Sequence, residues 1–322
     1  MADKPAVNRK LKTTLEDIVA TVRKAAPTIY EEAVAAAEGK GKPVPRKSDF
    51  DRFGIAVATR EGEMAAAGNA AVAFPIQSIS KVFALELALE AVGEKLWERV
   101  DREPTGDPFN SILDLEREKG IPRNPLVNAG ALVICDVLAG LRSQAGPRGR
   151  VARLIERLLD GESVALETDV MHGGGGNLNR SMMFMAKHHG NFQHDVDKVI
   201  AAYAQQCAIQ LDCRQLARAG RFLMRDAPER RQAADEGIAP DRRSRRILSI
   251  MMLCGLYDGS GDFAYRVGLP AKSGVGGGIL AIAPHRASIA VWSPALDPMG
   301  NSWLGTLGLE ELAKRTSWSV FG

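Results

Sequence analysis

The chain has 322 residues, of which 45% are hydrophobic and 25% are charged, and its formal net charge is +3. This length and apolar content suit one large or two smaller globular units with an ample core, and so small a net charge argues against a nucleic-acid partner. No apolar run is long enough to span a membrane and the polar first residues hold no secretory signal, so we expect a cytoplasmic protein that does not bind a membrane.

The first predicted element is a helix. Thr13 and Glu16 have the spacing of a capping box before an apolar-periodic run. Pro27 is expected to break this helix, which then resumes through Ala37. Residues 38–45 are rich in Gly, Pro and Lys and predict a loop.

A hairpin and a second helix come next. Residues 53–59 and 64–68 predict two strands joined by a turn at Glu61 and Gly62. An uninterrupted helical run, residues 82–91, follows Ser78.

The middle of the chain, residues 96–246, is predicted to be mostly helical. Helices are expected from Asn128, over 151–159, 181–188, 196–208 and 213–225, with a flexible loop at 173–176, which is four glycines. The basic runs at 230–231 and 242–246 are interleaved with acidic residues and predict a solvated surface of mixed charge. The four cysteines, Cys135, Cys207, Cys213 and Cys254, form no Cys-x-x-Cys pair and predict buried free thiols.

The period then returns to that of strands. Residues 278–283 and 287–292 predict two strands, and residues 301–315 a closing helix. The two halves of the sheet thus come from opposite ends of the chain, and hairpin connections make the sheet antiparallel. We expect one domain over 1–322, with a sheet-containing part at about 13–94 and 247–322 and a helical subdomain at about 95–246.

The most suggestive chemistry in the chain is Ser78-x-x-Lys81, whose two side chains share one helix face. A serine becomes a nucleophile when a base takes its proton, and a lysine is such a base only when burial or a nearby cation lowers its pKa. Apolar neighbours such as Ile79 and Val82 favour burial of Lys81. Taken alone, the pattern also fits a helix-capping Ser78 and a solvated Lys81.

A second motif, Lys272-Ser273-Gly274, lies late in the chain and is predicted to be on a strand of the sheet. In order, Ser78-x-x-Lys81, a polar element in the helical part and this triplet match the Ser-Lys acyl-transfer enzymes of the β-lactamase and penicillin-binding class. Lys272 would supply positive charge beside the Ser-Lys pair.

Longer blocks narrow the resemblance. The stretches at 77–81, 124–131, 254–258, 268–279 and 292–297, and Gly300-Asn301-Ser302, resemble the signature blocks of the serine-dependent glutaminases over roughly residues 53–310. The resemblance implies a β-lactamase-like α/β fold, with an antiparallel sheet flanked by helices and an inserted helical subdomain. It also implies hydrolysis of L-glutamine to L-glutamate and ammonia.

The resemblance implies roles for individual residues. Ser78 matches the nucleophile, Lys81 the residue that activates it, and Tyr203 a tyrosine placed to relay a proton. Tyr257 matches a second active-site tyrosine. The N–H groups of Ser78 and Val275 match an oxyanion hole.

Two asparagines, Asn128 and Asn179, match substrate-binding residues of the family. Without the resemblance, Asn128 would be expected to cap its helix, and the two tyrosines to belong to the core. The resemblance implies no metal or organic cofactor, and no His and Cys spacing predicts a metal site.

Two departures from the family pattern concern substrate recognition. The family carries a glutamate seven residues before the second asparagine, and it pairs with the substrate's α-ammonium; here that position holds His172. Either Glu167 or Asp169 takes this role through a different path of the loop, or His172 is an exposed loop histidine and free glutamine binds weakly.

The second departure lies upstream, where a family Tyr-Ile-Pro block reaches the substrate. This chain has Gly41-Lys42-Pro43 there, and Tyr30 is too far away to replace the tyrosine without a gap. Two alternative functions remain. The protein is a related serine amidohydrolase with a different small amide substrate, or it is a non-catalytic member of the family. The resemblance also suggests a homodimer or homotetramer.

Overall fold

The protein is described by a computed structural model covering residues 8–39, 41, 43–106, 111–141, 149–173, 176–225 and 238–322. Lys42, the basic pair at 230–231 and two of the four consecutive glycines, Gly174 and Gly175, lie outside the described residues.

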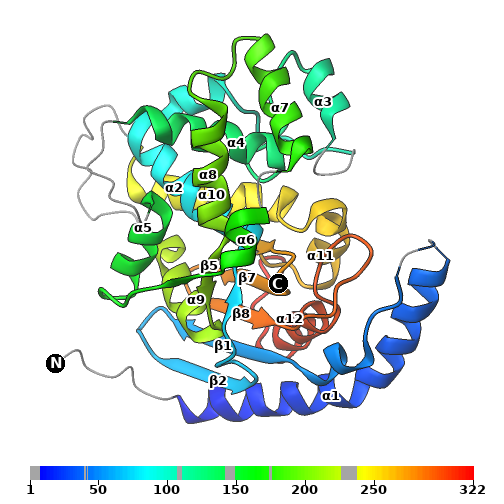
Figure 1. The fold of residues 1–322 in the computed structure, drawn as a ribbon. Helices are drawn as coiled ribbons and strands as arrows, with labels where there is room; N and C mark the ends of the chain where they lie inside the picture. Colours follow the sequence, from blue (N-terminus) through cyan, green and yellow to red (C-terminus); the bar gives the residue numbers. More distant parts are fainter. Residues whose placement is uncertain are drawn as a thin grey trace.

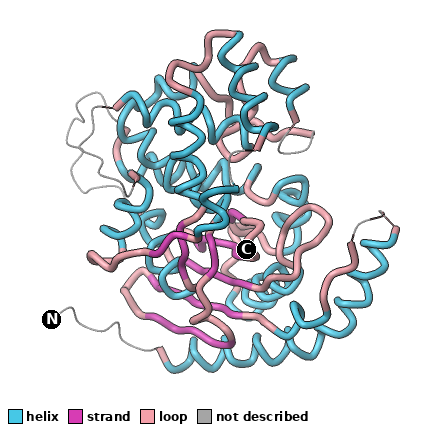
Figure 2. The backbone as a smooth tube through the Cα atoms, viewed as in Figure 1, coloured by secondary structure: helices cyan, strands magenta, loops and turns pink. Residues whose placement is uncertain are grey.

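A five-stranded antiparallel sheet in the order β2-β1-β8-β7-β6 lies in the lower half of the molecule (Figures 1 and 2). Its strands are β1 (Gly54–Thr59), β2 (Met64–Gly68), β6 (Ala271–Ser273), β7 (Gly278–Ala283) and β8 (Ala287–Trp292). The first strand pairs with the last, Gly54 opposite Trp292, so both ends of the chain build one sheet, as the sequence predicted.

Helices cover both faces of this sheet. Ile55 and Val57 pack with α1 (Arg9–Glu38) and α12 (Trp303–Thr316), whereas Ala56 and Ala58 pack into the other core with α9 (Cys213–Gly220). Because alternate residues of a strand point to opposite faces, every residue of β1, β7 and β8 is buried. This explains why these strands are continuously apolar in sequence.

Helix α1 departs from its prediction at two places. Asn8 caps it by accepting from Leu11 N–H, and Thr13 Oγ1 donates to Arg9 O one turn back, so the predicted capping box is wrong. The helix also continues through Pro27. Its apolar face packs against the sheet, α12 and the 3₁₀ turn Lys47–Asp51, and these tertiary contacts offset the backbone hydrogen bond that a proline removes.

The upper half of the molecule is mainly helical (Figure 2). The helices between the two parts of the sheet, besides α9, are α2 (Ser80–Val92), α3 (Ile112–Arg117), α4 (Asn128–Gly140), α5 (Arg150–Leu158), α6 (Thr168–Gly173), α7 (Asn177–His188), α8 (Val196–Cys207), α10 (Pro240–Cys254) and α11 (Ser260–Arg266). Helix α9, which the sequence placed in the helical subdomain, packs on β1 and β8 of the sheet. The subdomain boundaries at about 95 and 246 stay a prediction.

A second, three-stranded antiparallel sheet was not predicted. It has the order β3-β5-β4, with β3 (Phe74–Pro75), β4 (Ala165–Leu166) and β5 (Ile209–Leu211). Strands of two or three residues are too short to show a period in the sequence. This small sheet matters because β3 leads directly to Ser78.

The basic run at 242–246 is not wholly solvated. Arg243 is buried and donates to Glu86 on α2 and to Ile238 O. Arg242 and Arg245 are exposed as predicted. The helical period explains the difference, because positions 242 and 245 are three residues apart and share one face of α10, whereas position 243 points away from that face.

Candidate active site

Ser78 lies in a 3₁₀ turn, η2 (Gln77–Ile79), between β3 and the start of α2. The turn is held to the small sheet by the bond from Ile76 N–H to Ile209 O, 2.8 Å. Gln77, directly before the serine, has a φ of 47°, a backbone conformation that costs a residue other than glycine free energy. Such strain is typical of positions that the fold holds for a function.

Lys81 is 1% exposed and lies one turn after Ser78 on α2. Its Nζ donates to Leu126 O at 3.0 Å and to Asn128 Oδ1 at 2.8 Å. Burial lowers the pKa of Lys81 from 10.5 to about 8, although the nearby thiols of Cys207 and Cys135 oppose this shift. A solvated lysine, the alternative interpretation of the sequence, is wrong.

Asn128 joins three other polar side chains. Its Oδ1 accepts from Lys81 and from the Tyr203 hydroxyl at 3.3 Å, and its Nδ2 donates to Asn179 Oδ1 at 3.4 Å. The N-cap of α4 is Val127, so Asn128 does not cap its helix. The predicted residues Lys81, Asn128, Asn179 and Tyr203 therefore lie together, although they come from four different helices.

Tyr257, in the 3₁₀ turn Tyr257–Gly259, also contacts Ser78. It has a φ of 53°, and its phenol interacts with Ser78 and Ser273. Burial raises the pKa of Tyr257, and raises that of Tyr203 well above its usual value. Both phenols therefore stay protonated at neutral pH and can donate a proton.

Lys272 packs against the ring of Tyr257. Its Nζ lies 4.3 Å from the centre of the Tyr257 ring and donates to Gly255 O and Ser273 O, both at 2.8 Å. Burial, with a smaller contribution from the charge of Lys81, holds the pKa of Lys272 well below its usual value. Lys272 thus fixes the tyrosine, the end of β6 and the residues before Tyr257 relative to one another.

The turn after β6 packs against the serine turn. A Cβ on Gly274 would lie 2.6 Å from Ile76 O and 3.4 Å from Ser78 N, so only a glycine permits this approach. Gly274 N–H donates to Gly278 O and Gly277 N–H to Gly274 O, two bonds that leave out the Val275 N–H between them. The Val275 side chain is 44% exposed. Its backbone thus lies at the open side of a turn next to Ser78.

The predicted loop at His172 is wrong, because Thr168–Gly173 forms the short helix α6. His172 and Asp169 are exposed on this helix. Glu167 is half-buried; its N–H donates to Ala208 O at 2.7 Å, and its carboxylate accepts from Gln210 Nε2.

Glu167 and the serine turn are therefore attached to the same strand. Glu167 bonds to the carbonyl just before β5, and Ile76 bonds to the next carbonyl, Ile209 O, from the opposite edge. Two strands across a shared neighbour lie roughly 10 Å apart. This distance is within reach of a glutamate side chain and a small substrate.

Tyr30 does not replace the family tyrosine that is missing upstream, near Gly41. Its ring packs edge-on against Phe50 with the ring centres 5.4 Å apart, in the core between α1 and the sheet. Gly41 is exposed with a φ of 60°.

Three supporting groups were not predicted. They are the Leu126 carbonyl, which accepts from Lys81, and the side chains of Ser80 and Cys207, which lie 3.9 Å apart behind Tyr203. Asn124 shapes the Leu126 loop by accepting from Leu126 N–H and Val127 N–H. The block at 124–131 signalled this loop, but no local pattern joins residues 80 and 207.

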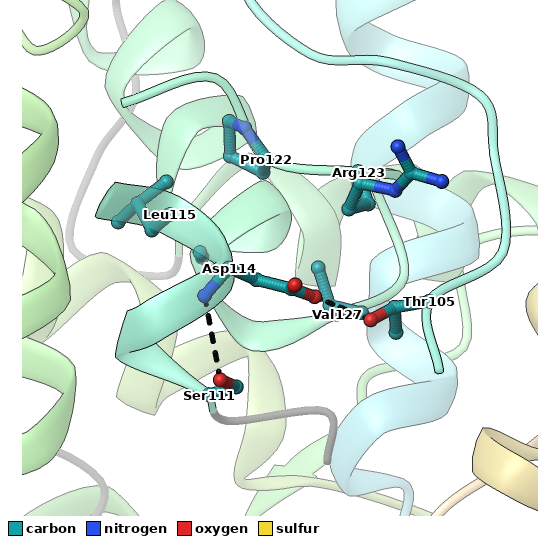
Figure 3. Close-up of a pocket in the computed structure, with 8 residues that line it drawn as sticks. Thr105, Ser111, Asp114, Leu115, Pro122, Arg123 and Val127 are labelled. Atoms are coloured by element: carbon teal, nitrogen blue, oxygen red, sulfur yellow. Dashed lines mark hydrogen bonds between the residues drawn. The ribbon is translucent and has the colours of Figure 1, made fainter. Parts of the chain in front are cut away.

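A small cavity lies beside this loop (Figure 3). It has a volume of ≈ 20 Å³, room for about one water molecule, and Asp114, hydrogen-bonded to Thr105, lines it with Val127. A second cavity of ≈ 20 Å³ reaches from Thr105 and Leu126 to Tyr257. The packing behind the Lys81 acceptors is therefore close.

Within the described ranges, no group of three or more His, Cys, Asp or Glu side chains could hold a metal ion. In the same part of the chain, no helix is both long and apolar enough to cross a bilayer.

Known proteins resemble this chain over nearly its full length. The family model described as Glutaminase matches residues 43–321. A glutaminase of Rhizobium johnstonii is 48% identical over 314 residues, which cover 97% of this chain and 99% of that protein. The chain belongs to the glutaminase family.

Solved structures of glutaminases are also similar to this protein. A probable glutaminase of Bacillus subtilis is 30% identical with a TM-score of 0.78, covering 97% of this chain and 98% of that chain. A Bacillus subtilis glutaminase in covalent complex with 5-oxo-L-norleucine, formed by reaction with 6-diazo-5-oxo-L-norleucine, is 28% identical with a TM-score of 0.74, covering 96% and 99%. The predicted family, the β-lactamase-like α/β fold and the assignment as a glutaminase, a hydrolase of the glutamine amide, are confirmed.

Proposed function

We propose that this glutaminase releases ammonia from L-glutamine with Ser78 as the nucleophile and Lys81 as its base. The observation that carries this proposal is the pair of acceptors around Lys81 Nζ, Leu126 O and Asn128 Oδ1. A neutral amine has two N–H bonds and one lone pair. With both N–H bonds directed at these oxygens, the lone pair is left for a proton from the serine one turn earlier on the same helix face.

The reaction then runs in two steps. Ser78 Oγ attacks the side-chain amide carbon of glutamine while its proton passes to Lys81, and the N–H groups of Ser78 and Val275 stabilise the developing oxyanion. The C–N bond breaks as the amide nitrogen takes this proton from Lys81 by way of Tyr203, and ammonia leaves with Lys81 neutral again. Water then attacks the glutamyl ester and gives a proton to Lys81, which passes it to Ser78 Oγ as the ester bond breaks, and glutamate departs.

We infer that Glu167 neutralises the α-ammonium of the substrate in place of the family glutamate. Glu167 is anchored by its backbone beside β5, the strand to which the serine turn is also bound, whereas His172 is exposed on α6. His172, when neutral, offers one acceptor nitrogen, and when protonated it repels an ammonium group. Asn128 and Asn179 are left to bind the polar groups of the substrate.

We propose that the protein acts in the cytoplasm as a homodimer or homotetramer. The free cysteines support a reducing compartment: Cys135, Cys207 and Cys213 are buried and Cys254 is partly buried. Light scattering of the purified protein gives the mass of the assembly, and a monomer would contradict the oligomer.

The test is ammonia release from L-glutamine, L-asparagine, N-acetyl-L-glutamine and the des-amino analogue glutaramate. We expect L-glutamine to be preferred, and Ser78→Ala to lose more than about 10³-fold in kcat at an unchanged Tm. Ser249→Ala, which removes an exposed hydroxyl on α10, is the matched control. Preference for another amide would indicate the related amidohydrolase, and no ammonia from any amide the non-catalytic alternative.

A further inference from the structure

The block Gly300-Asn301-Ser302 is given no role in the proposed reaction, but it lies beside the candidate site. A Cβ built on Gly300 would lie 3.5 Å from Tyr257 Cε2 and 3.5 Å from Val275 Cγ1. The loop of residues 297–301, which precedes α12, therefore packs against the tyrosine ring and against the turn whose N–H is assigned to the oxyanion hole.

This loop is closed on itself around Asp297. Asp297 Oδ1 accepts from Asn301 N–H at 2.9 Å, and Asp297 N–H donates to Asn301 O at 2.7 Å. Gly300 N–H donates to Asp297 O at 3.0 Å. The backbone of Asn301 is thus held on both sides, which limits where its side chain can reach.

The Asn301 side chain reaches the residue before Tyr257. Asn301 is 3% exposed, and its Nδ2 donates to Leu256 O at 3.1 Å, a contact between residues 45 apart in sequence. Ser260 holds the same turn from within, because its Oγ accepts from Leu256 N–H at 3.0 Å and donates to Tyr257 O at 2.9 Å. Three consecutive peptide groups, from residue 255 to residue 258, are therefore each bound by a side chain.

Tyr257 needs such support because its φ is 53°. This conformation is unfavourable for a residue other than glycine and persists only where the surrounding contacts impose it. The angle φ is set by the orientation of the Leu256–Tyr257 peptide group, whose oxygen Asn301 binds. Gly259 N–H also donates to Leu256 O, at 3.0 Å, but it belongs to the same turn and moves with it. Without the Asn301 bond, the peptide group can relax and the phenol moves away from Ser78.

From these contacts we propose that Asn301 is a positioning residue that holds Tyr257 in its strained conformation, with the phenol beside Ser78. The inference deepens the proposed function and rests on it, because the Tyr257 hydroxyl acts on the reaction only if Ser78 is the nucleophile. The competing explanation is that Asn301 only stabilises the fold before α12.

A double-variant cycle separates the two explanations. Asn301→Leu keeps nearly the same side-chain volume and removes the donor, and Tyr257→Phe removes the hydroxyl. If Asn301 acts through this hydroxyl, its substitution lowers kcat only while the hydroxyl is present. Asn191→Leu is the matched control, because Asn191 is 8% exposed and its Nδ2 donates to two carbonyls, Arg99 O and Gly120 O, in the helical half.

We expect Tyr257→Phe to lower kcat for L-glutamine about 100-fold. Asn301→Leu should lower kcat about 10-fold with KM changed less than about 3-fold, because a reacting group is misplaced while the substrate still binds. In the Tyr257→Phe background, Asn301→Leu should lower kcat less than about 2-fold further. Asn191→Leu should lower Tm at least as much as Asn301→Leu does, but leave kcat within about 2-fold of the natural protein.

If Asn301→Leu does not fold, Asn301→Ala, which adds no branched side chain, enters the same cycle. Multiplied losses in the double variant, or equal kcat values for the Asn301 and Asn191 variants, would overturn the inference. A Tyr257→Phe variant with normal kcat would overturn it too, since its hydroxyl would then need no positioning. Ser78→Ala is measured in the same series. If it retains activity, the proposed serine mechanism fails; if it is inactive while the cycle contradicts a link between Asn301 and Tyr257, only the role of Asn301 fails.

Discussion

The two sides of the candidate site are held by the fold very differently. The acylation side consists of Ser78, Lys81, Asn128, Tyr203, Tyr257 and Lys272, and the recognition side of Glu167, Asp169, His172 and Asn179. Lys81 and Lys272 are almost wholly buried, and their side-chain nitrogens each donate to two oxygens. On the recognition side Asp169 and His172 are exposed on a helix of six residues.

This difference explains where the sequence departs from its family. In a buried hydrogen-bonded network, removal of one member leaves another polar group without its partner, at a cost of about 1–3 kcal/mol or more. An exposed side chain can change at little cost in stability. His172 and Gly41, where the sequence was interpreted as departing from the family pattern, are both exposed, whereas most residues that the motifs assigned to the acylation side are buried.

The largest effect on the acylation side, after loss of the nucleophile, is expected for Lys81→Ala. Removing the base should lower kcat about 10³-fold, and the Ser78/Lys81 double variant should be little slower than either single one, because the pair acts as a unit. Multiplicative losses in the double variant would mean that Lys81 only supports the structure.

The lowered pKa of Lys81 predicts how kcat depends on pH. The base must be neutral, and burial lowers the pKa of Lys81 to about 8, so kcat should rise with pH up to about 8 and level off above it. A pH–rate profile for L-glutamine over pH 6–10 checks this. A kcat that is still rising steeply at pH 10, as for a lysine with its usual pKa, would contradict a buried base.

The next largest loss of activity is expected when the contact between the Val275 turn and the serine turn is disturbed. In Gly274→Ala the new methyl group would lie 2.6 Å from Ile76 O, which must move and carry Ser78 with it. We expect kcat to fall about 100-fold, because a small misplacement of reacting groups is costly. Gly261→Ala is the control, since no atom lies within 4 Å of its new methyl group. Equal activity of the two variants would mean that this approach does not position the nucleophile.

Local patterns predicted the central pair of the acylation side because its two residues are close in sequence, whereas Tyr203 and Tyr257 came only from the family resemblance. Ser78 and Lys81 are three residues apart, and the apolar residues around Lys81 indicated its burial. The acceptors of Lys81 at Leu126 and Asn128 lie 45 and 47 residues away, and only the family resemblance pointed to Asn128.

The other features of the fold and site could not be predicted from the sequence, because they depend on contacts between distant segments or on tertiary packing that overrides local propensity. The bond between Ser80 and Cys207 spans 127 residues, and the small sheet has strands too short for a period. Pro27 predicted a break, but packing of α1 on the sheet overrides it. The glycines at 173–176 predicted a loop, but His172 belongs to a helix that ends at the first of them.

On the recognition side, Glu167→Gln is expected to weaken L-glutamine selectively. The loss of the charge opposite the α-ammonium should raise KM about 10-fold for L-glutamine and leave glutaramate, which lacks the ammonium, nearly unchanged. Asp169→Asn is the matched control, because it removes an exposed carboxylate two residues later. If Asp169→Asn raises KM and Glu167→Gln does not, Asp169 has the role assigned to Glu167.

The smallest effect is expected for His172→Glu, which restores the family residue at its counted position. Because His172 is exposed on α6 and Glu167 already supplies a carboxylate, the added charge is screened by solvent and should change kcat/KM for L-glutamine less than about 3-fold. His188→Glu, at an exposed position of α7, adds the same charge and serves as the control. Both variants are compared on L-glutamine and glutaramate. A rise of about 10-fold confined to His172→Glu and to L-glutamine would mean that the substrate's ammonium lies at His172 and lacks a counter-charge in the natural protein. In that case free glutamine binds weakly to the natural protein, and Glu167→Gln should leave its KM unchanged.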